Sequence, residues 1–175
     1  MSNPLILSDV VAALTGLADP VASRSTARLV QNWVTAGLVR PVPQPRGGRG
    51  VHRLFDQQEL RKMAVLFELN CHRLPWAILQ LAGALFDQLR ELPEAIRQTR
   101  PAAALVAQQQ RLAPLRFLLE AAITGTRVVF LVIEPNEDSE PEVALRGGDW
   151  KVADVRSATF VNLTEVLRPH WTVTD

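Results

Sequence analysis

The sequence of 175 residues predicts an α+β protein, and three features carry this prediction. Up to Thr124, apolar residues recur at spacings of three and four, which is typical of helices that bury one face. After Gly125 the pattern changes to short apolar runs such as TRVVFLVIE, which favour strands. Between the helical segments, the stretch VPQPRGGRGVHRLF (42–55) is rich in proline and glycine, which is typical of a hairpin and not of a helix.

Charge is distributed unevenly along the chain. The formal net charge is +1, but residues 1–75 hold nine Arg and Lys against five Asp and Glu (+4), whereas residues 76–175 hold ten against thirteen (−3). Between Asp19 and Asp56 there is no acidic residue, while six arginines fall there: Arg24, Arg28, Arg40, Arg46, Arg49 and Arg53. This asymmetry predicts a basic face for a polyanion on the N-terminal part of the chain.

The single cysteine and the lengths of the apolar stretches indicate the cellular compartment in which the protein is expected. The single cysteine, Cys71, excludes an internal disulfide framework and favours a reducing, cytoplasmic setting. The first residues lack the basic segment of a secretory signal, and the apolar stretch 74–86 is shorter than the roughly 20 residues of a membrane-spanning helix. We therefore expect a soluble, cytoplasmic protein without a membrane partner.

Motifs for catalysis or cofactor binding are absent from the sequence. It contains no G-x-S-x-G, H-E-x-x-H or phosphate-loop motif, and its three histidines are scattered. The adjacent pair Cys71 and His72 has no second cysteine to complete a metal site. We expect a protein that is not an enzyme and that needs no cofactor or metal.

Two short helices are predicted at the start of the chain. The first is capped by Ser8 and ends at Gly16; the second is capped by Ser23 or Ser25 and ends at Gly37. The second helix has an apolar stripe that buries a tryptophan and leaves arginines on its other face. Periodicity alone fits a DNA-binding helix-turn-helix and an ordinary helical hairpin equally well.

The stretch after the second helix predicts a basic wing. Prolines in 41–45 favour an extended approach strand, the glycines of 47–50 permit a tight tip, and apolar and polar residues alternate along 51–55. A disordered Gly/Arg tract would usually repeat and would not need the Leu-Phe ending. We therefore predict a hairpin whose arginines are held beside the second helix.

Residues 5–85 resemble the DNA-binding domain of MerR-type regulators. The most specific matches are GLVRP (37–41) and RLFD (53–56), which are similar to the family's "IGLLRP" and "GYRLY" segments in the same order. The resemblance implies a winged helix-turn-helix, with the second helix in the major groove and the wing on the backbone and minor groove. It also implies a two-fold dimer on a pseudo-palindromic promoter site, a contact with RNA polymerase, and Asp56 as the cap of the next helix.

The candidate DNA-binding residues lie on the second helix and on the wing. Those on the helix are placed for base edges, because guanidinium and amide groups make bidentate contacts in the major groove. Those at the glycine tip suit phosphate or narrow minor-groove contacts. The full set is Arg24, Ser25, Thr26, Arg28, Gln31, Arg40, Arg46, Arg49, His52 and Arg53.

The middle of the chain is predicted to link and to dimerise. A helix over 76–86 is expected to be followed by a short helix and linker around Pro93, and then by a helical seam that Pro114 interrupts. We assign residues 1–86 to the DNA-binding domain, 87–124 to linker and dimerisation helices, and 125–175 to a β-rich unit. The seam residues are Leu105, Leu112, Leu115 and Leu119.

The last part of the chain is predicted to be a small β-rich unit for dimerisation or effector binding. Strands are expected at 126–134, 142–146 and 150–155, separated by an acidic loop and a Gly-Gly turn. A final strand runs into a short helix capped by Asn162 or Thr164.

These features together predict a sequence-specific transcription regulator that binds double-stranded promoter DNA as a homodimer. The alternative is an excisionase-like or architectural protein that bends DNA during recombination. A protein-interaction module with an acidic partner is a third and weaker hypothesis.

Overall fold

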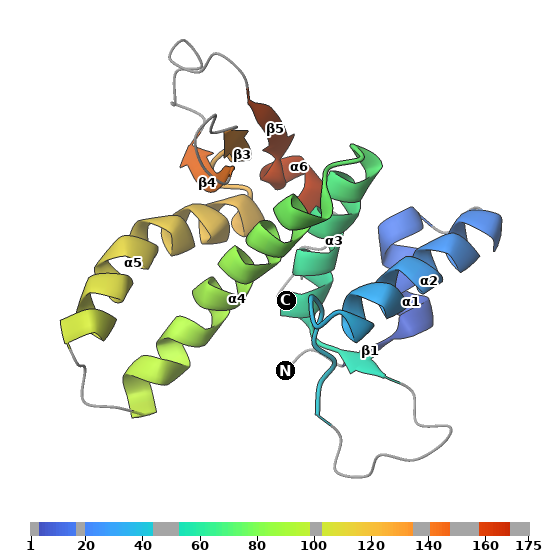
Figure 1. Cartoon of the computed structure of the whole chain (residues 1–175), viewed down its shortest axis with the longest axis horizontal. Helices are drawn as coiled ribbons and strands as arrows, with labels where there is room; N and C mark the ends of the chain where they lie inside the picture. Colours follow the sequence, from blue (N-terminus) through green and yellow to red (C-terminus); the bar gives the residue numbers. More distant parts are fainter. Residues whose placement is uncertain are drawn as a thin grey trace. The chain divides into compact units, whose positions relative to one another are not determined.

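The computed structural model of the chain describes residues 4–16, 20–43, 53–98, 103–134, 141–147 and 158–168. These residues form six helices, a two-stranded sheet near the N-terminus and a three-stranded antiparallel sheet near the C-terminus (Figure 1). The predicted α+β class is therefore confirmed. The chain divides into two compact units, residues 1–67 and 68–175.

The N-terminal unit begins with a short strand that leads directly into a helix. Strand β1 (Leu5–Ile6) is followed by α1 (Leu7–Thr15), whose cap is Ile6 and not the predicted Ser8. The carboxylate of Asp9 does the capping instead, because its Oδ2 accepts a hydrogen bond from the Ile6 N–H at 3.2 Å. Gly16 ends the helix as predicted, with φ +69°.

Helix α2 (Pro20–Thr35) starts earlier than expected and ends where expected. It begins at Pro20, not at Ser23 or Ser25, because proline fits the first turn of a helix. At its end Gly37 has φ +74°, and the N–H of Leu38 donates to the Trp33 carbonyl at 2.9 Å. This hydrogen-bond pattern is a Schellman motif, which needs a residue that tolerates positive φ.

A small sheet brings the start of the chain to the base of the predicted wing. Strand β2 (Leu54–Phe55) pairs antiparallel with β1, with Leu5 opposite Phe55. The N–H of Val42 donates to the carbonyl of Leu54 at 2.8 Å, so the two ends of the intervening loop are joined. The predicted glycine tip lies outside the described residues.

Helix α3 (Gln57–Cys71) follows at once and runs across the division between the units. Asp56 caps it as predicted, with its Oδ1 accepting from the N–H of Glu59 at 2.8 Å. The helix ends in another Schellman motif, in which Arg73 takes the left-handed position with φ +56°. This is the one residue other than glycine with positive φ in the part of the chain that the structure describes.

Two long helices in the C-terminal unit continue through prolines that were expected to break them. Helix α4 (Trp76–Gln98) includes Pro93, and α5 (Ala103–Thr124) includes Pro114. Figure 1 shows α5 as one bent helix. A proline removes one backbone hydrogen bond and bends the helix, but the turns on both sides can hold it together.

The C-terminal sheet has the order β4–β3–β5. Strands β3 (Val129–Glu134), β4 (Glu142–Gly147) and β5 (Thr159–Asn162) confirm three predicted strands, whereas the one predicted at 150–155 lies outside the described residues. Asn162 caps α6 (Leu163–Leu167) by accepting from the N–H of Glu165 at 3.3 Å.

Thr164 joins α6 to the start of β3. Its buried Oγ1 accepts from the N–H of Val129 and donates to the carbonyl of Arg127, both at 3.0 Å. One hydroxyl thus satisfies two backbone groups that are far away in sequence. The short helix is fixed to the sheet by this contact and by its buried leucines.

Each unit has its own apolar core. In the N-terminal unit the fully buried side chains include Val10, Val30, Trp33, Phe55 and Met63. The buried side chains of the C-terminal unit come from α4, α5, α6 and the sheet, and include Ala82, Leu112, Ala122, Leu131, Leu145, Leu163 and Leu167. No helix in the described ranges is both long and apolar enough to span a bilayer.

Candidate nucleic-acid interface

Helix α2 presents a polar stripe to solvent. Arg24, Arg28, Gln31 and Thr35 are all exposed, and their spacings of four, three and four residues place them on one helix face. The opposite face carries Trp33 and other core residues. The helix therefore offers a continuous row of hydrogen-bonding side chains that packing does not use.

A shallow hollow of about 470 Å³ lies beside this stripe. The residues that line it are Arg24, Ser25, Arg28, Leu29 and Asn32. Thr26, in contrast, is only 4% exposed and belongs to the buried face. Thr26 is therefore not part of the surface stripe, because residues two positions apart on a helix lie on different faces.

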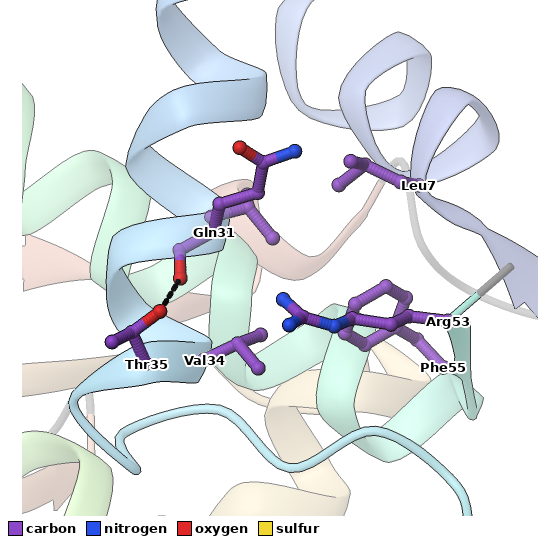
Figure 2. A pocket seen from close by; sticks show the side chains of 7 residues that line it. Leu7, Gln31, Val34, Thr35, Arg53 and Phe55 are labelled. Carbon is purple, nitrogen blue, oxygen red and sulfur yellow. Dashed lines mark hydrogen bonds between the residues drawn. The ribbon is translucent and has the colours of Figure 1, made fainter. Parts of the chain in front are cut away.

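A second hollow of about 380 Å³ lies between α2 and strand β2 (Figure 2). Its wall includes Gln31 and Thr35 of α2 and also Arg53, the residue that precedes β2. Figure 2 shows the guanidinium of Arg53 extending from the strand toward the helix. Arg53 is exposed, so this cation lies at the surface beside Gln31 and Thr35 of the polar stripe.

The chain just after α2 is attached to α3 by a buried acid. The N–H of Arg40, whose side chain is exposed, donates to Glu59 Oε2 at 3.1 Å. Glu59 also pairs with Lys62 at 3.1 Å, and these two side chains are only 1% and 2% exposed. Sequence reasoning missed this pair, although the spacing of three between Glu59 and Lys62 at the start of the segment ELRKMAVLF (59–67), on a helix that must bury its apolar face, was a usable signal. Burial lowers the pKa of the neighbouring Arg61 guanidinium from its ordinary value.

Three acidic side chains in the described part of the N-terminal unit are engaged in hydrogen bonds or an ion pair. The unit's formal charge is +4, from eight Arg and Lys against four Asp and Glu. Asp9 and Asp56 accept hydrogen bonds at helix N-termini, and Glu59 belongs to the buried pair. None of these three carboxylates is part of the α2 stripe, so the stripe keeps its positive character.

Three predicted wing residues, Arg46, Arg49 and His52, lie outside the described residues. Of the predicted dimerisation residues, Leu105 lies in α5, but its side chain is outside the described set. Leu112 is 3% exposed, and α5 packs against α4, α6 and the sheet of its own chain. The apolar face at Leu112 is therefore covered within the chain itself.

Cys71 and His72 lie at the end of α3. Partial burial of the thiol and the nearby carboxylate of Glu68 both raise the pKa of Cys71, so the thiol stays protonated over a wider pH range. Glu68 Oε1 is 3.2 Å from His72 Nε2. Within the described ranges there is no cluster of three or more His, Cys, Asp or Glu that could hold a metal ion.

No protein-family model matches this chain, and a search of curated proteins gives no significant match.

Proposed function

We propose that this protein is a DNA-binding transcription regulator that inserts α2 into the major groove of double-stranded DNA. The observation that supports this best is the exposed row of Arg24, Arg28 and Gln31 on α2. These side chains project from one helix face, and an α-helix fits the width of the major groove. Arginine and glutamine are the residues that make bidentate contacts with guanine and adenine edges.

The loop after α2 would act as the wing of a winged helix-turn-helix. The hydrogen bond from Val42 to Leu54 joins its two ends, and Arg53 is exposed beside α2. Arg46 and Arg49 lie within this loop in sequence. Arginines on such a loop would reach phosphates or the minor groove, which gives affinity with little sequence information.

Salt dependence is the first test of this proposal. If about five arginines contact phosphates, the logarithm of the affinity should fall with the logarithm of salt concentration at a slope of about −4 to −5. The measurement is fluorescence anisotropy with a labelled duplex from upstream of the gene and with a scrambled duplex. Salt-insensitive binding would count against an interface built on these arginines.

Variants identify the surface. Replacing Arg24 and Arg28 together with alanine should weaken binding about 100-fold or more, because two charge-assisted contacts are removed. The matched control replaces Arg116 and Arg168, two exposed arginines of the C-terminal unit, and removes the same charge. Equal loss of affinity in both double variants would show that only net charge matters.

Footprinting tests the biological role and the dimer. A homodimeric regulator should protect one pseudo-palindromic site near a promoter, with half-sites about one helical turn apart. Phased repeats at an attachment site would instead support an architectural role in recombination.

A further inference from the structure

A cavity in the C-terminal unit combines apolar and cationic walls. It has a volume of about 600 Å³ and lies between α4, α5 and β4. Leu85 of α4 and Leu112 and Leu115 of α5 form apolar parts of the wall. Cavities of about 300–1,000 Å³ are the usual size of small-molecule sites.

Two guanidinium groups line the same cavity. Arg111 comes from α5 and is exposed, whereas Arg146 comes from β4 and is half-buried. The carboxylate of Glu142 is exposed at the start of β4, so water screens its charge. Gln88 of α4 adds an amide to the polar part of the wall.

The Nε atom of Arg146 is buried and has no hydrogen-bond partner among the described residues. A terminal nitrogen of the same guanidinium is 3.7 Å from Glu134 Oε1, which is a long ion pair. Buried donors are normally satisfied, and one carboxylate or phosphate can accept from two nitrogens of one guanidinium. The side chain as a whole is 37% exposed, so other atoms of this arginine stay within reach of a ligand in the cavity.

Strand β4 supplies Glu142, Val143, Ala144 and Arg146 to this wall. It is an edge strand, because the described sheet has the order β4–β3–β5. The outer row of N–H and C=O groups on an edge strand is not used by the neighbouring strand. Both sides of the cavity therefore mix polar and apolar residues, with Glu142 and Arg146 beside Val143 and Ala144 on the strand, and Gln88 and Arg111 beside the leucines on the helices.

We propose that this cavity binds a small amphipathic organic anion, with its acidic head on Arg146 and Arg111 and its apolar body against the leucines of α4 and α5. The inference is independent of DNA binding, because every residue that carries it belongs to the C-terminal unit. Carboxylates and phosphate monoesters share the required head-group chemistry.

Calorimetric titration of the full chain tests the ligand class. The probes are octanoate, octyl phosphate, 1-octanol and acetate. We expect an eight-carbon anion to bind about tenfold or more tightly than octanol, which lacks the charge, and than acetate, which lacks the apolar body. Comparing octanoate with octyl phosphate shows whether the head group is a carboxylate or a phosphate.

Variants locate the site. Arg111→Gln and Arg146→Gln should each weaken binding of the anion about tenfold, whereas Arg116→Gln, on α5 but outside the cavity wall, should leave it unchanged. Gln88→Trp should block the cavity from an exposed position, and Gln80→Trp, equally exposed on α4, is its control. Circular dichroism monitors folding.

Three results would overturn the proposal. One is no binding of either eight-carbon anion at millimolar concentration. Another is octanol binding as tightly as octanoate and octyl phosphate. The third is unchanged affinity in Arg111→Gln and Gln88→Trp, whose substituted positions are exposed and do not threaten the fold.

Discussion

The buried pair of Glu59 and Lys62 allows a quantitative test of how the N-terminal unit is held together. Their charged atoms are 3.1 Å apart, and the side chains are 1% and 2% exposed. With an effective dielectric constant of about 20, the attraction at this distance is about 5 kcal/mol, which the cost of desolvating both groups largely offsets. Removing one partner leaves the other buried without its opposite charge, which costs about 3–5 kcal/mol.

The perturbation is a double-mutant cycle of Glu59→Gln, Lys62→Met and both together. Glutamine keeps an oxygen that can accept from the N–H of Arg40, so the cycle mainly removes charge. Each single variant should lower the free energy of unfolding by about 3–5 kcal/mol. The double variant should lose less than the sum of the two, by about 2–3 kcal/mol, because it leaves no unpaired buried charge.

Urea unfolding followed by circular dichroism measures these free energies. Single losses below about 1 kcal/mol that simply add would refute the reasoning, because they are typical of an ion pair surrounded by water. A DNA-binding assay on the folded double variant would then show whether the attachment at Arg40 also positions the basic surface.

Three further outcomes are expected. Thr164→Val should lower the free energy of unfolding by about 2–4 kcal/mol, because two buried backbone groups lose their hydrogen-bond partner. Thr164→Ser keeps the hydroxyl and should lower it by only about 1 kcal/mol. Equal losses in the two variants would argue against the role of the hydroxyl. Gly37→Ala should cost about 1 kcal/mol in thermal unfolding through its positive φ alone, since the added methyl carbon meets no atom within 4 Å; an unchanged or raised melting temperature would contradict this. Iodoacetamide should alkylate Cys71 more slowly than free cysteine until the pH exceeds the raised pKa of Cys71, as measured by mass spectrometry. Glu68→Gln removes one cause of the raised pKa and should make alkylation faster. A rate equal to that of free cysteine at every pH would contradict the raised pKa.

The sequence predicted elements best where local chemistry decides them. Gly16 and Gly37 end helices by taking positive φ, Asp56 begins one through its carboxylate, and the apolar run at 129–134 forms a strand. The misplaced helix starts at Ile6 and Pro20 have local causes, whereas the errors at the prolines came from longer-range effects. Helix continuation through Pro93 depends on the turns on both sides, which local propensity does not describe.

The candidate interface was predicted from the sequence in part. Helical periodicity placed Arg24, Arg28 and Gln31 together, and all three are exposed in the structure. Thr26 was grouped with them, although a residue two positions from Arg24 and from Arg28 lies on the opposite face of a helix, where the structure buries it. The wing arginines and the dimer contacts stay predictions.

The cavity proposed to bind an anion could not be found from sequence alone. Arg111 and Arg146 are distant in the chain and come together only through the packing of α5 on β4. Neither residue belongs to a motif. Only the three-dimensional arrangement showed that one of them has a buried nitrogen without a partner among the described residues.

The pairing of β1 with β2 has a consequence for the order of folding. Leu5 pairs with Phe55, so the first strand of the chain has to wait for a partner fifty positions later. Local helices such as α1 and α2 can form and pack much earlier, because closing a long loop costs entropy that short-range contacts avoid. We expect the β1–β2 sheet to assemble last in this unit, so that a polypeptide emerging from the ribosome acquires the basic helix α2 before it acquires this sheet.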